Sequence, residues 1–97
     1  MSRLKIVWSE QARRTLKDIY NFYKEKSPQG AIQVRSDILQ GPRSLHFAEQ
    51  YQKDDINPRY HRMVVRDFKI LYTEEEGVIQ TVDIVSAKQS PEELRNK

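Results

Sequence analysis

Hydrophobic and polar positions alternate most clearly between residues 60 and 72, and this alternation predicts a β-hairpin. If Arg66 and Asp67 form a two-residue turn, directly opposed residues share one face of the sheet. One face is then apolar and suited to a core, while the other carries two cations. A register shift of one residue would mix the two faces. The apolar face comprises His61, Met63, Val65, Phe68, Ile70 and Tyr72, and the basic face comprises Tyr60, Arg62, Val64, Lys69, Leu71 and Thr73.

Two segments with helical periodicity precede this hairpin. Residues 4–8 first form a short run of β-branched and aromatic side chains, which predicts a strand. Ser9 is a suitable N-cap for the helix that follows, in which apolar residues recur at helical spacing. Ser27 and Pro28 mark the start of a second helix, since proline has no N–H to leave unpaired in the first turn. We expect that helix to end or kink before Pro42.

The remaining segments complete a single α+β domain over residues 1–97. Residues 48–59 are polar and without periodicity, which predicts a loop. Residues 78–85 are apolar on both faces, which favours a central strand. Ser90 begins a capping box that is typical of a short C-terminal helix. The predicted order is β-α-α-β-β-β, a small antiparallel sheet with the N-terminal helical hairpin packed on one face and the basic face open.

Composition narrows the class of protein. Charged residues make up 32% of the 97 residues and the net charge is +3, which by itself is weak evidence for a polyanionic partner. The absence of cysteine excludes a disulfide scaffold and a thiolate metal site. No apolar run approaches the roughly 20 residues needed to cross a bilayer, and the N-terminus lacks the apolar segment of a signal peptide. We therefore expect a cytoplasmic protein with no membrane partner.

The side chains available for chemistry are mostly cations. The chain has no glycine-rich phosphate loop, no clustered metal ligands and no serine or cysteine nucleophile signature. His61 falls on the apolar face, which favours a packed histidine over a catalytic one. Cations around the hairpin could hold phosphates and stabilise charge at a scissile phosphate, and Tyr60 could stack on a base, although each cation alone is more simply a solvated charge. The cations are Lys53, Arg62, Arg66, Lys69 and Lys88.

The order and spacing of these segments resemble the RelE/ParE superfamily of bacterial toxins from type II toxin–antitoxin systems. The resemblance spans nearly the whole chain and is most specific between residues 62 and 72. It implies a growth-inhibiting toxin without a metal or cofactor, and a cognate antitoxin whose disordered C-terminal region folds over the toxin in a hetero-oligomer. The segments that carry the resemblance are Ser9-Glu-Gln-Ala, the helix junction at Ser27-Pro28, Tyr60-His-Arg-Met-Val-Val, Phe68-Lys-Ile-Leu-Tyr72, Val82-Asp-Ile-Val and Lys88-Gln-Ser-Pro-Glu-Glu-Leu94.

Two mechanisms occur in this superfamily. RelE-like members are mRNA interferases that cut messenger RNA on the ribosome without a metal, whereas ParE-like members inhibit DNA gyrase. Many of the ribonucleases carry His, Tyr or Asp where this chain has Ala87-Lys88, and general acid–base catalysis contributes about 10²–10⁴-fold. The group of cations slightly favours the endoribonuclease; a gyrase inhibitor and an inactive antitoxin-binding protein are the alternatives. For this chain the ribonuclease hypothesis implies catalytic roles for Arg62, Lys69 and Lys88, and RNA contacts for Lys53, Arg66 and Tyr60.

Overall fold

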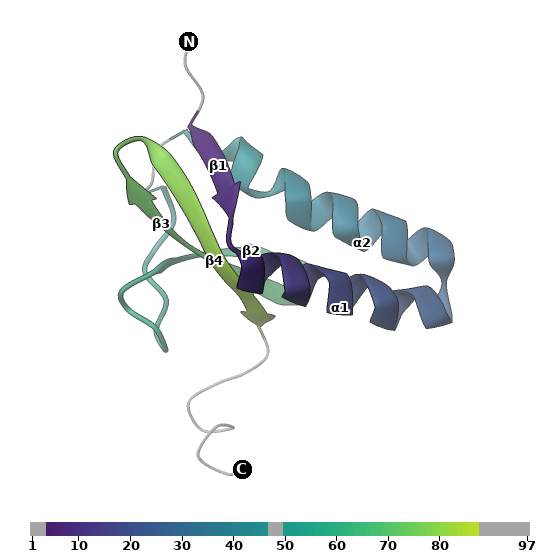
Figure 1. The fold of residues 1–97 in the computed structure, drawn as a ribbon. Coiled ribbons are helices and arrows are strands. Elements are labelled where there is room, and N and C mark those ends of the chain that lie inside the picture. Colours follow the sequence, from purple (N-terminus) through teal and green to yellow (C-terminus); the bar gives the residue numbers. More distant parts are fainter. Residues whose placement is uncertain (1–3, 47–49, 88–97) are drawn as a thin grey trace.

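The helices and strands follow the predicted order. The structure, a computed structural model, describes residues 4–46 and 50–87. The order β-α-α-β-β-β is confirmed there, and the C-terminal helix predicted from Ser90 lies outside the described residues. In chain order the elements are β1 (Lys5–Trp8), α1 (Glu10–Lys26), α2 (Pro28–Gln40), the short 3-10 helix η1 (Pro42–Ser44), β2 (His61–Val65), β3 (Phe68–Glu75) and β4 (Val78–Ser86) (Figure 1).

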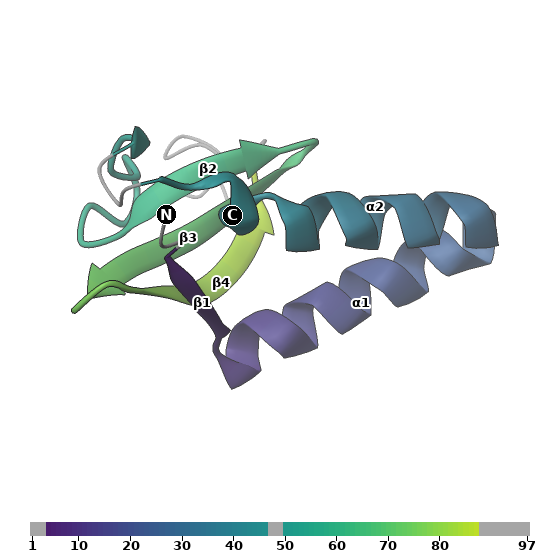
Figure 2. The same cartoon turned by 90° about the horizontal axis from the view of Figure 1, so that it is seen from above.

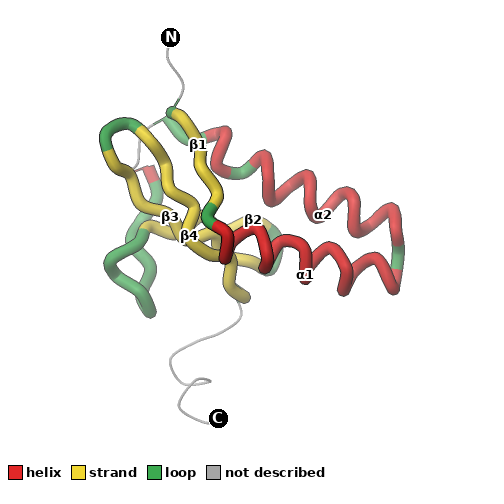
Figure 3. Tube along the Cα trace, viewed as in Figure 1, coloured by secondary structure: helices red, strands yellow, loops and turns green. Residues whose placement is uncertain are grey.

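The strands form one mixed sheet in the order β1-β4-β3-β2 (Figure 3). Strands β2, β3 and β4 pair antiparallel as predicted, and β4 is an inner strand, as its apolar faces indicated. The sheet differs from the prediction at β1, which runs parallel to β4. The reason is the helical hairpin: α1 leads away from the end of β1 and α2 leads back toward its start (Figure 1). The chain can therefore re-enter the sheet with a later strand in the direction of β1.

Serine side chains fix both helix starts. The Ser9 hydroxyl accepts the Ala12 N–H at 3.0 Å and donates to the carbonyl of Val82 at 2.7 Å, which ties the start of α1 to β4. The Ser27 hydroxyl caps α2, and the predicted break before Pro42 is confirmed, since α2 ends at Gln40. The two caps and the break are local features, and each occurs where the sequence placed it.

The predicted register of the β2–β3 hairpin is confirmed. Val65 pairs with Phe68, so Arg66 and Asp67 form the two-residue turn, with Arg66 at φ 56°. The apolar face of the hairpin contacts the helices, which lie on one side of the sheet (Figure 2). The buried core there consists of Leu16, Val34, Ile38, Leu45, Met63, Ile70, Tyr72, Ile79 and Ile84.

The opposite face of the hairpin is not open at its centre. Lys69 and Leu71 lie on this face, yet they are 7% and 3% exposed. The segment of residues 52–60, which precedes β2, lies on the side of the sheet away from the helices (Figure 2). Its Asp54 is 1% exposed and contacts Lys69. The prediction of an open basic face is therefore wrong at Lys69, and only Val64, at 58% exposed, fits it.

Candidate functional site

A buried ion pair lies at the centre of the predicted basic face. The Lys69 ammonium donates to Asp54 Oδ1 at 2.6 Å, and both side chains are almost inaccessible to solvent. Arg62 lies at the rim of this pair, with its Nη1 3.9 Å from Asp54 Oδ1 and 3.2 Å from Oδ2 of the exposed Asp55. We call Asp54, Arg62 and Lys69 the Asp54 cluster. Its two cations are the pair that the sequence placed together, but Asp54 neutralises Lys69, and the exposed Asp55 pairs with Arg62.

The Asp54 carboxylate is held in the ionised state. Its Oδ2 accepts the backbone N–H groups of Ile56 at 3.1 Å and Asn57 at 2.9 Å. Burial by itself would raise the pKa of Asp54, but the hydrogen bond from Lys69 and the two backbone N–H groups outweigh it, so the pKa lies below its ordinary value of 3.8. Asp54 therefore carries a negative charge at neutral pH and compensates the charge of Lys69.

Backbone hydrogen bonds position Asp54 over the sheet. The Arg62 N–H donates to the carbonyl of Gln52 at 2.9 Å, and the Asp54 N–H donates to the carbonyl of Tyr60 at 2.8 Å. An isolated antiparallel bridge also joins Lys53 to His61. The 52–60 segment thus runs along the outer edge of β2 and then turns over the second face, so that one edge strand is partly covered by its own chain.

His61 is packed, as predicted. Its Nδ1 lies 2.8 Å from the Tyr51 carbonyl oxygen, so this nitrogen is the donor, and its ring stacks on Tyr72 with centroids 5.4 Å apart. Because Tyr72 is a core residue on the helix-covered face, the His61 ring belongs to that face as well. The imidazole is thus separated by the sheet from the Asp54 cluster and is not placed to move a proton there.

The other predicted site residues do not gather around the Asp54 cluster. Arg66 donates from Nε to Asp37 Oδ2 on α2 at 2.7 Å, on the helix side of the hairpin, and this hydrogen bond, together with one from Gln33, lowers the pKa of Asp37. Lys53 is exposed and Tyr60 is half-buried at the end of the loop. Lys88 lies outside the described residues. The structure therefore brings together Arg62 and Lys69, and it places Arg66 elsewhere.

Asp54 is the member of this candidate site that was not predicted from the sequence. The polar run of residues 48–59 predicted only a loop. An aspartate three residues before Asn57-Pro58 is a signal for a turn in which the carboxylate accepts backbone N–H groups. That signal could have located the turn, but no local pattern connects Asp54 to a lysine fifteen residues further along the chain.

A second candidate site is a groove between β1 and the two helices, with a volume of about 610 Å³. Apolar side chains, among them Trp8, Leu16 and Leu39, form much of its lining. Three cations, Arg13, Lys17 and Arg35, also line it, and no acidic residue does. We call this site, with these three cations, the cationic groove. Arg13 and Lys17 lie on the exposed face of α1, whereas Arg35 comes from α2 and the strand edge from β1.

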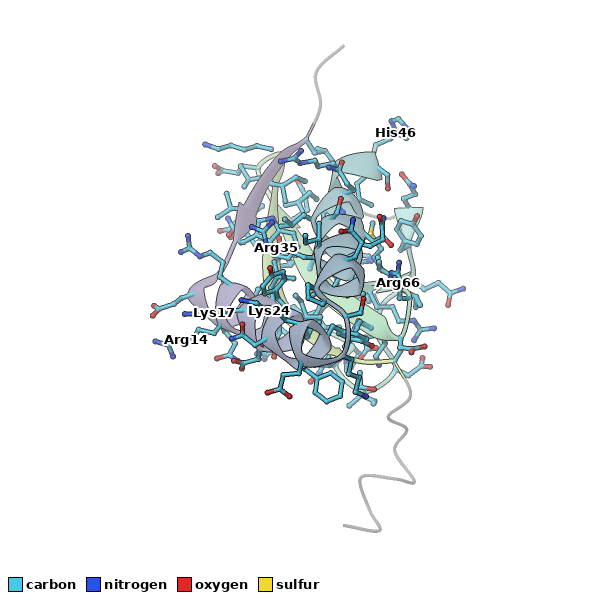
Figure 4. The ribbon with its side chains drawn as sticks, turned by 90° about the vertical axis from the view of Figure 1, so that its right-hand side faces the viewer. Arg14, Lys17, Lys24, Arg35, His46 and Arg66 are labelled. Carbon is cyan, nitrogen blue, oxygen red and sulfur yellow. The ribbon has the colours of Figure 1, made fainter. Side chains whose placement is uncertain are left out.

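The groove cations differ from the Asp54 cluster in their partners. Lys17 and Arg35 lie on the β1 side of the helical hairpin, whereas Arg66 lies on the other side of α2 (Figure 4). None of the ion pairs among residues 4–46 and 50–87 involves a groove cation. β1 is also an edge strand with no further strand beside it in the described sheet. The groove therefore combines accessible positive charge, apolar surface and an open strand edge.

The described part of the chain also limits other kinds of site. Within it, no group of three His, Cys, Asp or Glu side chains is arranged to hold a metal ion. No helix in this part is long and apolar enough to cross a membrane.

Comparisons with known proteins agree with the fold. The sequence model of the family described as ParE toxin of type II toxin-antitoxin system, parDE, matches residues 6–91. Among solved structures, the chain is similar to one titled "Chromosomal ParDE TA system from P. aeruginosa", with 20% identity and a TM-score of 0.77 over 89% of this chain and 98% of that chain. This likeness supports the fold alone. No curated protein matches the chain.

Proposed function

Since the chain belongs to the family of ParE toxins of type II toxin–antitoxin systems, we propose that it inhibits growth by binding its target and does not cleave RNA. The observation that carries this proposal is the 2.6 Å hydrogen bond from the Lys69 ammonium to the Asp54 carboxylate, both of them buried. A metal-independent ribonuclease needs accessible cations at the scissile phosphate. Here the most central cation is covered and neutralised.

The groups that could transfer protons also argue against RNA cleavage. Cleavage through a 2′-hydroxyl needs a base and an acid within hydrogen-bonding reach of the reacting atoms. His61 lies on the opposite face of the sheet, stacked on Tyr72. Ser86 and Ala87, at the end of β4, have no titratable side chain at neutral pH. The endoribonuclease favoured from the cations alone is therefore the weaker hypothesis.

DNA gyrase is the target we propose, because inhibition of gyrase is the mechanism that the resemblance implies for ParE-like members. On this proposal the protein acts in the cytoplasm. Binding requires exposed surface and no catalytic group, so a toxin of this kind can bury its basic sheet face without loss of activity.

We propose that the cognate antitoxin occupies the cationic groove. An acidic, amphipathic segment would complement Arg13, Lys17 and Arg35, while its apolar residues would contact the lining formed by Trp8 and Leu39. The open edge of β1 could also accept an added strand. The groove supports this proposal by its charge and its apolar lining.

The deciding experiment compares the two mechanisms directly. The purified protein is expected to inhibit DNA supercoiling by gyrase, while its induction in cells leaves ribosome-bound messenger RNA without codon-phased ends. The matched variant is Arg62→Ala, which removes the half-buried cation but retains the Asp54–Lys69 pair. It is expected to remain toxic and to inhibit gyrase as the wild type does. Codon-phased cleavage that disappears in Arg62→Ala, with normal supercoiling, would overturn the proposal.

A further inference from the structure

We propose that the 52–60 segment is a lid over a latent phosphate-binding site formed by Arg62 and Lys69, and that the Asp54 carboxylate occupies the position of the phosphate. The inference goes beyond the proposed function, which does not use this site. Its ligand class is the phosphate group of a single-stranded nucleic acid. The lid prevents the toxin from holding nucleic acid through this face.

The first support is the chemistry of the groups around the carboxylate. Asp54 accepts hydrogen bonds from one ammonium and two backbone N–H groups, and a guanidinium lies 3.9 Å from it. Ammonium, guanidinium and backbone N–H groups are also the donors that proteins use for phosphate oxygens. Asp54 is thus an internal anion among donors that would suit an external one.

The second support is the way in which the lid is closed. The described residues of the lid contribute one fully buried side chain, Asp54, and its partner Lys69 is on β3. A buried ion pair adds little stability compared with apolar residues of similar size, but removing one partner leaves the other charge uncompensated. Besides the backbone hydrogen bonds of Gln52 and Asp54, closure therefore depends on one buried carboxylate. If that charge is lost or displaced, the Lys69 ammonium must regain water or bind another anion.

The third support is the charge that opening would expose. With the lid closed, Lys69 is 7% exposed and Arg62 is 25% exposed at the rim. With Asp54 displaced, Lys69 would join Arg62 on one face of the hairpin, where the two lie on neighbouring strands. Adjacent cations on a sheet face can contact successive phosphates of an extended strand.

The test uses Asp54→Asn with Asp55→Asn as the matched control. The asparagine side chain can still accept the Ile56 and Asn57 N–H groups, but it removes the charge. With a short single-stranded RNA at low salt, fluorescence anisotropy is expected to show about tenfold tighter binding for Asp54→Asn than for the wild type. Asp55→Asn, which removes an exposed charge near the same arginine, is expected to change affinity less than about threefold. Adding Lys69→Met to Asp54→Asn should abolish the gain.

A folded Asp54→Asn protein that binds RNA no more tightly than Asp55→Asn would overturn the proposal. Because Asp54→Asn could lose its fold, hydrogen exchange of the wild type provides an independent measurement. Inorganic tripolyphosphate in excess is expected to accelerate exchange at the amides of Asp54, Ile56 and Asn57, and to leave the amide of Ala31 unchanged, since Ala31 lies in α2 and lines neither site. Unchanged exchange at the three lid amides would contradict displacement of Asp54. Neither experiment involves gyrase or the ribosome, so failure here leaves the proposed function standing.

Discussion

Two groups of cations in this protein have the same residue types but opposite environments. Lys69 and Arg62 lie around a buried carboxylate on the sheet face away from the helices. Lys17 and Arg35 lie along an apolar groove and form no ion pair with any residue that the structure describes. A cation contributes to recognition only when its charge is accessible to the partner. The comparison therefore favours the groove as the surface for an acidic partner.

The two groups of cations should also contribute to different properties, one to the stability of the fold and the other to binding. In a site with little water, the attraction between opposite charges is strong but largely offsets the cost of removing them from water. At an exposed groove, charges contribute little to folding and much to the rate and selectivity of association. Substitutions at the Asp54 cluster should thus affect the free energy of unfolding, and substitutions at the groove should affect binding.

The largest effect is expected for Asp54→Ala. It leaves Lys69 buried without a counter-ion and should lower the free energy of unfolding by about 3–5 kcal/mol. Asp55→Ala is the matched control, because its side chain is 83% exposed, and it should change stability by less than about 0.5 kcal/mol. Urea unfolding followed by circular dichroism measures both. Equal stability of the two variants would show that the buried pair does not hold the fold.

The next effect concerns the groove. Reversing two of its charges in Lys17→Glu/Arg35→Glu should weaken binding of the cognate antitoxin about 10–100-fold, because an acidic segment would then meet like charge. The control is Lys53→Glu/Arg59→Glu, which makes the same charge change at exposed lid residues. Isothermal titration calorimetry gives both affinities. A larger loss in the control would place the antitoxin on the lid side of the molecule.

A smaller effect is expected at acid pH. Because the pKa of Asp54 is lower in the folded state than its ordinary 3.8, the unfolded chain takes up a proton first as the pH falls. The stabilisation by this carboxylate is therefore complete above about pH 4 and is lost as the pH falls through the lowered pKa. Urea midpoints measured against pH should show this loss in the wild type and in Lys17→Ala. In Asp54→Asn, the part of this loss that comes from protonation of Asp54 should be absent.

The smallest effect is expected at the hairpin turn, which lies outside both groups of cations. Arg66 has φ 56°, a conformation that glycine adopts without strain, and its side chain pairs with Asp37 at the surface. Arg66→Ala loses the pair and keeps the unfavourable backbone, so Arg66→Gly should be more stable than Arg66→Ala by about 1 kcal/mol. Thermal unfolding of the two variants provides the comparison. The reverse order would show that the turn is not strained.

Much of the fold could be predicted because its determinants are local. The alternation around the hairpin fixes which residues share a face, and a shift by one residue would have separated Met63 from Ile70, which pair on the core face. Ser9 and Ser27 accept N–H groups from the first turns of their own helices, so both caps are visible in the local sequence, although Ser9 also bonds to β4. The parallel pairing of β1 was not predictable in this way, since it depends on where α2 returns the chain.

The candidate sites could be predicted only in part. Arg62 and Lys69 were correctly placed on one face, because strand register determines it. The solvent exposure of these two cations was not predicted, because it depends on the carboxylate of Asp54, which lies in a loop with no periodic pattern. The cationic groove was not predicted for a similar reason, since its lining comes from β1, α1 and α2. The cations of α1 by themselves indicate no more than an exposed helix surface.

The sequence by itself thus indicated the superfamily and determined the helix caps and the two-faced hairpin. The caps and the hairpin could be predicted because backbone geometry and hydrogen bonding act between residues close in the chain. The tertiary structure alone decided which cations are available. Long-range packing placed Asp54 against Lys69 and left Arg35 beside Lys17 without a carboxylate. The availability of a charge depends on its solvent exposure and on its nearest opposite charge, and both are set by segments that lie far apart in the sequence.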